Sequence, residues 1–340
     1  MPIDVATIFE DPRLMLFGYE GEFARFIVMD RDSYARSIFF DARVQAADQQ
    51  VYRVPLAPLL AHLANTGFKP PRIGFIHHFA QSGSTLLARA LDHPGNLVIR
   101  EPLHLRQLGV GAATSSAQKL TLLQFSLNML GKRFAPDAPL IVKGNVPISL
   151  VADQIADLDP GQPAILLHFS LADYCAAVLR TPNHQRWVES ISSEIGLQQD
   201  PSIGNLAHLS VVEKAAALWY VMVKRFERLL ALHPAMRSLD ANLLFDRPAA
   251  TILAANGLFD AGLSEVEAAA AADGPLFATY SKNPNMPYDP ATRIERREQT
   301  KSELKAELDL ARRWVDQRNG LAAVPEALDR PLLGQSARLL

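Results

Sequence analysis

Residues 72–91, RIGFIHHFAQSGSTLLARAL, constrain the fold of this chain more than any other segment does. Residues 73–76 are apolar and few, which is typical of an interior strand, and residues 81–85 supply a tight turn of small residues. Residues 86–91 then have the spacing of a helix. Free backbone amides at the start of that helix, beside the neighbouring hydroxyl groups, would bind a phosphate or a sulfate.

This loop differs from the ATP-binding P-loop pattern at two places. The pattern has glycine where this chain has His78, and lysine where this chain has Ser84. The segment therefore predicts a phosphate-binding loop without the Walker lysine. The alternative is a serine-rich helix cap that binds no ligand.

Short apolar runs continue to alternate with helical stretches after the loop. Such alternation favours an α/β fold, a mostly parallel sheet flanked by helices as in P-loop nucleotide-binding proteins. The clearest helix covers residues 211–232, where apolar side chains recur every three or four positions. Besides residues 73–76, the predicted strands are residues 97–99, 140–142, 164–169 and 237–239.

The first part of the chain, residues 1–68, is predicted to be a small β-rich appendage. Its strands are expected at residues 14–18, 23–29 and 34–40, which are rich in aromatic and apolar side chains. Residues 54–63 are expected to form a short helix. Lys69-Pro70-Pro71 then marks a boundary, and residues 69–340 form the larger α/β domain.

The C-terminal part is expected to hold two helices with a loop between them. Residues 261–273 are rich in alanine, and residues 302–317 are charged and amphipathic. Between these helices, residues 277–297 are predicted to be an extended loop with a basic end. This loop is either a lid over a ligand or an ordinary solvent-facing loop. Its basic residues are Lys282, Arg293, Arg296 and Arg297.

Composition excludes several classes of partner. The 34 basic and 36 acidic residues give a formal net charge of −2, so we expect neither nucleic-acid binding nor attraction to an anionic membrane. The single Cys175 permits no intrachain disulfide, and no apolar run approaches the ~20 residues that span a bilayer. We therefore expect a cytoplasmic protein without a metal site, since no metal-binding motif is present. Assembly into homo-oligomers stays open.

Several segments in a fixed order resemble the sulfotransferases that use 3'-phosphoadenosine-5'-phosphosulfate (PAPS). The four loop residues Ser82, Gly83, Ser84 and Thr85 match that family's 5'-phosphosulfate loop. Arg100-Glu101-Pro102 and the strand ending at Lys143 resemble the next segments, and residues 219–234 and 238–248 resemble later ones. The resemblance covers about residues 70–260 and implies a divergent member of the family.

Two departures from the family pattern are as informative as the matches. Gln81 replaces the basic residue that contacts the phosphosulfate in this family. Phe169 and Ala177 stand where the family's 3'-phosphate segment has arginine and serine. We expect Ser170, Arg180 or Arg186 to substitute for these, and His184 lies between the two arginines in the sequence.

The resemblance and the strand positions together suggest roles for individual residues. The predicted cofactor-binding residues are Gln81, Ser82, Gly83, Ser84, Thr85, Arg89, Ser170 and Arg180. Glu101, which follows the strand at residues 97–99, is the candidate general base, with His104 as the other candidate. Lys143 is the candidate cation, since the carboxyl ends of parallel strands border the ligand crevice. The structural alternatives are a helix-capping acid for Glu101 and a surface lysine for Lys143.

These expectations lead to a function. The chain is predicted to transfer a sulfuryl group from PAPS to a hydroxyl or amine of a small-molecule acceptor, without a metal. One alternative is a small-molecule kinase, against which the missing Walker lysine argues. The other is a non-catalytic nucleotide-binding protein that kept the fold, an alternative that Gln81, Phe169 and Ala177 support.

Overall fold

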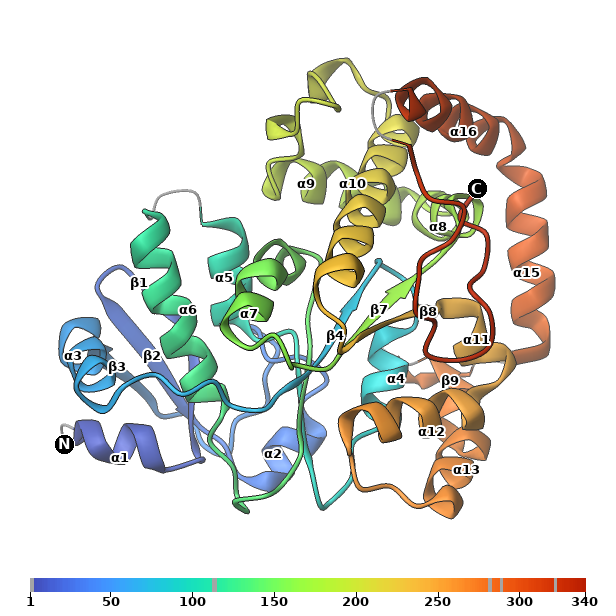
Figure 1. Cartoon of the computed structure of the whole chain (residues 1–340). Coiled ribbons are helices and arrows are strands. Elements are labelled where there is room, and N and C mark those ends of the chain that lie inside the picture. The colour runs from blue at the N-terminus through green and yellow to red at the C-terminus, as the bar shows by residue number, and fades with distance from the viewer. Residues whose placement is uncertain (1–2, 112–114, 281–282, 288–289, 321–322) are drawn as a thin grey trace.

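The computed structural model describes residues 3–111, 115–280, 283–287, 290–320 and 323–340. Its centre is a five-stranded parallel sheet in the order β5-β6-β4-β7-β8 (Figure 1). This arrangement confirms the predicted α/β fold class. The strands are β4 (Gly74–His78), β5 (Leu97–Arg100), β6 (Leu140–Lys143), β7 (Ala164–His168) and β8 (Met236–Asp240).

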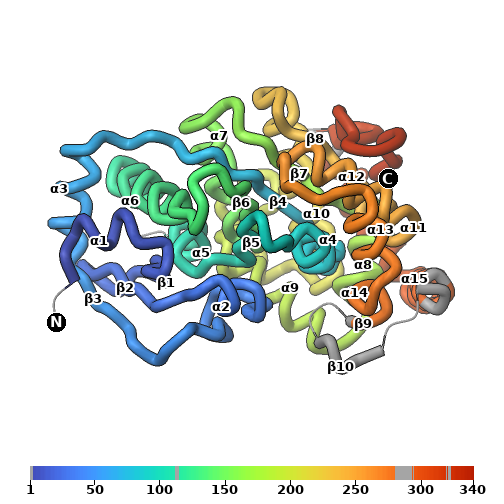
Figure 2. Tube along the Cα trace, turned by 90° about the horizontal axis from the view of Figure 1, so that it is seen from below, coloured from blue at the N-terminus to red at the C-terminus, as the bar shows by residue number. Residues whose placement is uncertain are grey.

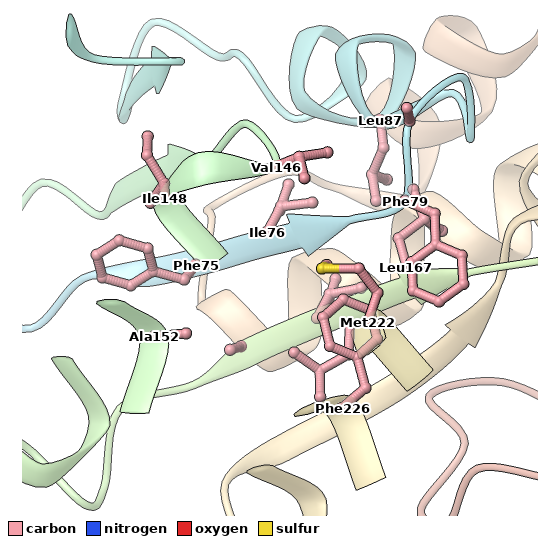
Figure 3. Close-up of a cluster of buried hydrophobic side chains, with 14 of the residues drawn as sticks. Phe75, Ile76, Phe79, Leu87, Val146, Ile148, Ala152, Leu167, Met222 and Phe226 are labelled. Carbon is pink, nitrogen blue, oxygen red and sulfur yellow. The ribbon is translucent and has the colours of Figure 1, made fainter. Parts of the chain in front are cut away.

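Helices cover both faces of this sheet. Its central strands are therefore buried along their whole length. Leu87 of α4 and Phe226 of α10 lie on opposite sides of β4 (Figure 3). The helix α10 has the predicted bounds, and Ser210 and Glu213 close a capping box at its start. The helices around the sheet are α4 (Ser84–Ala90), α5 (Leu103–Val110), α6 (Ser116–Leu130), α7 (Ala152–Leu158), α8 (Leu171–Leu179), α9 (Pro182–Glu194), α10 (Val211–Leu232), α11 (Ala241–Asp246) and α12 (Pro248–Phe259), with 3₁₀ turns at Pro147–Val151, Leu197–Gln199 and Leu206–His208.

The N-terminal unit contains an antiparallel three-stranded sheet, in the order β1-β2-β3. The prediction of a strand at residues 34–40 is wrong. Asp30 accepts a hydrogen bond from the Ser33 amide and caps a helix there, and the third strand instead precedes the predicted helix. The elements are α1 (Val5–Glu10), β1 (Leu14–Glu20), β2 (Phe23–Val28), α2 (Arg31–Arg36), β3 (Val51–Pro55) and α3 (Leu56–Thr66).

The N-terminal unit packs against the larger part of the chain through apolar side chains. Phe125 and Met129 of α6 join a buried cluster with Leu16 and Phe26 of the small sheet. The unit and the C-terminal helix α15 lie at opposite ends of the molecule (Figure 2). A domain boundary at residue 69 stays a prediction.

The C-terminal segment is more regular than the sequence suggested. The predicted loop at residues 277–297 is wrong in its second half, because the chain is helical from Pro290 onward. Lys301 of this helix forms an ion pair with Asp173 of α8, at 2.7 Å, which fixes the helix on the domain. Lys282 lies outside the described residues. The elements are α13 (Glu265–Asp273), α14 (Pro275–Ala278), β9 (Thr279–Tyr280), β10 (Asn283–Pro287), α15 (Pro290–Glu303) and α16 (Lys305–Asn319).

Two further findings concern the described part of the chain. None of its helices combines the length and the apolar character needed to cross a bilayer. Cys175 is fully buried, and burial raises the pKa of its thiol to about 12. The thiol therefore behaves as a small apolar group.

Three buried histidines make the fold sensitive to acid. Burial lowers the pKa of His77 and of His168 to about 4 each, and that of His104 to about 3. Since histidine in an unfolded chain has a pKa of about 6.5, the unfolded state binds more protons as the pH falls below that value. The native state is therefore expected to lose stability in mild acid.

Urea denaturation of the wild type and of His104→Leu tests this expectation. Between about pH 7 and pH 5, the variant should lose about 2 kcal/mol less stability than the wild type, because it no longer contains one of these groups. Equal losses in the two proteins would contradict the account of His104.

Candidate active site

The loop between β4 and α4 makes the tight turn that the sequence predicts. Gln81 and Gly83 have φ angles of 64° and 81°, so the backbone turns sharply before the helix begins. The Oγ of Ser82 and the Oγ1 of Thr85 are buried without a hydrogen-bond partner among the described residues. Because buried hydroxyls are rarely left unpaired, these two fit an absent ligand with oxygen atoms.

The two histidines before the loop point in different directions. His77 stacks on Phe75, with ring centroids 5.6 Å apart. His78 lines the cavity beside the loop, and its Nε2 lies 2.7 Å from the carbonyl oxygen of Gly144. This is the alternation that a strand imposes on successive side chains.

A cavity of about 350 Å³ opens on the loop. It brings together residues from the loop, from the ends of β5 and β6, from α8 and from α15. Among the predicted site residues, those that line it are Gln81, Ser82, Gly83, Ser84, Thr85, Glu101, Lys143 and Arg180.

Glu101 and Lys143 form an ion pair at the edge of this cavity. They come together because Arg100 and Lys143 are register partners on the parallel strands β5 and β6. Glu101 then turns at a φ of 59°, and its amide donates to the carbonyl of Lys143 at 2.7 Å. A non-glycine residue at such a φ is uncommon and is often found at functional sites.

Burial differs between the two partners of this pair. The Lys143 side chain is 1% exposed, whereas that of Glu101 is 17% exposed and reaches the cavity. Burial lowers the pKa of Lys143, and the charge and hydrogen bond of Glu101 act in the opposite direction. The pair therefore places a hydrogen-bonded carboxylate on the wall of the cavity.

Two cavity residues from the N-terminal unit were missed by sequence reasoning. Phe39 and Arg43 both line the cavity, and the Arg43 guanidinium lies 3.8 Å from the centre of the Phe39 ring. Arg43 also donates from Nε to Asp41 at 2.9 Å, and this hydrogen bond raises its pKa. No local motif marks these residues, since they reach the cavity only through contacts between distant parts of the chain.

Three predicted residues are not brought to the cavity. His104 is fully buried on α5 beside a second, much smaller cavity that Tyr34 and Lys132 also line. The hydroxyl of Ser170 caps α8 by accepting from the Asp173 amide at 3.2 Å. Arg89 lies within α4, and burial lowers its pKa.

The far side of the cavity, beyond the loop, combines apolar and basic groups. Phe169 and Ala177 line it, at the places where the resembling family has arginine and serine. Arg180, the residue directly after α8, also lines the cavity, and its Nη2 lies 3.5 Å from Nε2 of His184. The other basic and hydroxyl residues of this side are Arg293, Arg296, Arg297 and Thr300 of α15.

Side chains hold the α15 residues in place. Arg297 donates from Nη1 to the Asn242 amide oxygen at 2.6 Å, and the Arg293 guanidinium stacks on Phe245 at 3.4 Å. Arg186 instead bonds to Asn183 on its own helix, at the exposed surface. Within the described ranges, no group of three or more His, Cys, Asp or Glu side chains has the arrangement of a metal site.

Comparison with known proteins gives matches at the level of structure alone. No protein-family model matches this sequence, and no curated protein does. A sulfotransferase from Alicyclobacillus acidocaldarius is similar with a TM-score of 0.39 and 13% identity, over 74% of this chain and 96% of that one. The sulfotransferase domain from the curacin biosynthetic pathway is similar with a TM-score of 0.41 and 14% identity, over 74% of this chain and 98% of that one.

Proposed function

We propose that this protein transfers a sulfuryl group from PAPS to a hydroxyl or amine of a small-molecule acceptor. One observation supports this most: a single cavity joins the unpartnered hydroxyls of the loop to the Glu101–Lys143 pair. Such a cavity offers an anion-binding surface and a hydrogen-bonded carboxylate to the same bound molecules. The single buried cysteine suits a reducing compartment such as the cytoplasm.

The residues present fit the anionic groups of PAPS in part. The hydroxyls of Ser82 and Thr85 would donate to oxygens of the 5'-phosphosulfate, and Lys143 would add positive charge near the leaving group. Arg180 and the α15 arginines are the cations available for the 3'-phosphate, because Phe169 and Ala177 offer no charge there. This chain would therefore bind the 3'-phosphate with residues outside the family's segment.

The proposed reaction needs one base and one charge-stabilising group. The acceptor oxygen or nitrogen attacks the sulfur of PAPS, and the bond between that sulfur and the bridging oxygen breaks. The electron pair leaves with 3'-phosphoadenosine-5'-phosphate, and Glu101 takes the proton of the acceptor. Lys143 orients the Glu101 carboxylate through their ion pair and stabilises negative charge that develops at the leaving oxygen.

A transfer assay tests this function. Purified protein is incubated with radiolabelled PAPS and a panel of phenols, aliphatic alcohols and primary amines, and labelled products are separated. We expect transfer to at least one acceptor, and a rate about 100-fold or more lower for Glu101→Gln, which removes the base. Equal rates for the wild type and for Glu101→Gln would contradict the assigned role of Glu101.

The neutral side chain at Gln81 is the specific observation that favours a non-catalytic protein. Replacing Gln81 distinguishes that alternative from a sulfotransferase. Gln81→Lys should raise the transfer rate about 10-fold or more, because lysine adds charge beside the bound phosphosulfate. Gln81→Met is the matched control, since it changes the side chain without adding charge. A gain with methionine equal to that with lysine would exclude the electrostatic explanation, and no gain with either would indicate different chemistry.

A further inference from the structure

We infer that residues 37–43 form the wall of the acceptor site, and that buried Arg100 is the positioning residue that holds this wall segment in place. The inference rests on the proposed function and extends it to the N-terminal unit. Phe39 and Arg43 of the wall segment line the same cavity as Glu101 and Lys143. Arg100 itself does not line that cavity, so it acts through the segment that it holds.

Arg100 is hydrogen-bonded to the backbone at the N-terminal end of the wall segment and just before it. Its side chain is 1% exposed, and its guanidinium donates to the carbonyl oxygens of Ser37 at 2.6 Å, Tyr34 at 3.0 Å and Ile38 at 3.3 Å. Its remaining nitrogen, Nη1, pairs with Asp92 at 2.9 Å. A planar guanidinium suits this role because its donors point in several fixed directions at once.

The backbone of Phe40 continues the attachment past the end of β5. Its amide donates to the carbonyl of Arg100 at 2.8 Å, and its carbonyl accepts from the amide of Leu103 at 3.1 Å. These two bonds lie on either side of Glu101 in the sequence. The same stretch of backbone therefore holds both the candidate base and the wall segment. The neighbouring Phe39 ring consequently lies 5.9 Å from Nζ of Lys143.

The order of the strands in the sheet indicates which reactant contacts the wall segment. The phosphate loop follows β4, and the basic groups of α8 and α15 lie beyond β7 on one side of it. Glu101 follows β5 and Lys143 is the last residue of β6, on the other side of the loop. The wall segment is attached at β5, so it faces the side where the acceptor must meet its base.

The chemistry of the wall points to a class of acceptor. Phe39 presents an aromatic ring, and Trp187 and Ile191 are further apolar residues of the cavity. Asp41 forms an ion pair with Arg43 and neutralises its charge. The wall segment therefore does not favour an anionic acceptor. We therefore assign the site to a hydroxyl or amine carried on an aromatic or otherwise apolar body.

The test compares Arg100→Lys with a matched control, Arg31→Met. The lysine keeps a charge for Asp92 but cannot reach the three carbonyls together. Arg31 also pairs with Asp92, at 3.2 Å, but its other hydrogen bond goes to the carbonyl of His93 and not to the wall segment. Hydrogen exchange of residues 37–44 and steady-state kinetics with naphthol and with ethanolamine as acceptors are measured for both variants.

Arg100→Lys should accelerate exchange in the wall segment at least about 10-fold and raise the KM for naphthol by a similar factor, while the Kd for 3'-phosphoadenosine-5'-phosphate changes less than about 2-fold. Arg31→Met should change none of these. Phe39→Leu should raise the naphthol KM without accelerating exchange, because the anchor stays intact. Unchanged exchange in Arg100→Lys would overturn its positioning role, and a wild type that prefers ethanolamine would overturn the assigned acceptor class.

The outcome separates this inference from the proposed function. If the wild type binds the bisphosphate and exchange rises in Arg100→Lys without any change in the naphthol KM, the wall is not part of the acceptor site. If the wild type transfers no sulfuryl group to any acceptor, the proposed function and the acceptor assignment both fail. The exchange experiment then still decides whether Arg100 holds the segment.

Discussion

Lys143→Met is expected to lower kcat for sulfuryl transfer about 1,000-fold. The substitution removes the cation at the cavity edge and leaves the Glu101 carboxylate without the partner that orients it. Loss of one preorganised charge-stabilising group typically costs about 100- to 1,000-fold in kcat, and here two functions are lost together. Single-turnover rates with saturating PAPS measure the effect on the chemical step.

The same substitution is expected to destabilise the fold. Removing one partner of a fully buried ion pair costs about 3–5 kcal/mol, and the cost here should be smaller because Glu101 keeps contact with solvent. The double variant Glu101→Leu/Lys143→Met removes both charges, so it should recover stability and remain inactive. This separates the loss of activity from the loss of fold.

Lys132 provides the matched control for Lys143. It is also a buried lysine, and burial lowers its pKa to about 7, but it donates to the carbonyls of Ile8 and Leu14 and does not line the cavity. Lys132→Met should lower the urea midpoint and leave kcat of the folded protein unchanged. If Lys143→Met kept the kcat of the wild type, Lys143 would have no part in the reaction.

Gly83→Ala is expected to weaken binding of 3'-phosphoadenosine-5'-phosphate about 100-fold or more. Gly83 has a φ of 81°, and a Cβ there would lie 2.7 Å from Cζ of Phe245 and 3.1 Å from Cδ2 of Leu244. A left-handed alanine alone costs about 1–2 kcal/mol, and the contact with α11 requires the loop or the Phe245 ring to shift as well. Titration calorimetry on the folded variant measures the affinity.

Substitution of Gly204 is the control that separates the cost of backbone strain from the effect of a displaced loop. Its φ of 79° is nearly that of Gly83, but a Cβ there would meet no atom within 4 Å. Gly204→Ala should therefore lose about 1–2 kcal/mol of stability and bind the bisphosphate as the wild type does. Wild-type affinity in Gly83→Ala would show that the loop conformation does not matter for binding.

The sheet and the strand–turn–helix around residues 81–85 could be predicted because their determinants are local. An apolar run such as residues 73–76 forms an interior strand wherever both of its faces are covered, and Gly83 readily adopts one of the two positive φ angles of the turn. The meeting of Glu101 and Lys143 also follows from sequence, since both residues lie at the carboxyl ends of predicted strands.

Other features depend on contacts between distant parts of the chain. The residues that place Phe39 beside Lys143 include Arg100, whose bonds to Ser37 span 63 positions of the sequence. His104 was a candidate base because it is close to Glu101 in sequence, yet the rotation of α5 buries its ring in the core. Likewise α15 has few apolar residues, and its ion pairs with Asp173 on α8 could not be found from periodicity.

The most direct test of the central claim is isothermal titration of the wild type with 3'-phosphoadenosine-5'-phosphate, and separately with ATP and magnesium. The structure offers hydroxyls and cations to a nucleotide bisphosphate, and Ser84 stands where an ATP-binding loop has its lysine. We predict micromolar or tighter binding of the bisphosphate and at least about 10-fold weaker binding of ATP. Preference for ATP would contradict the account in favour of a kinase, and binding of neither would contradict it in favour of a protein without this activity.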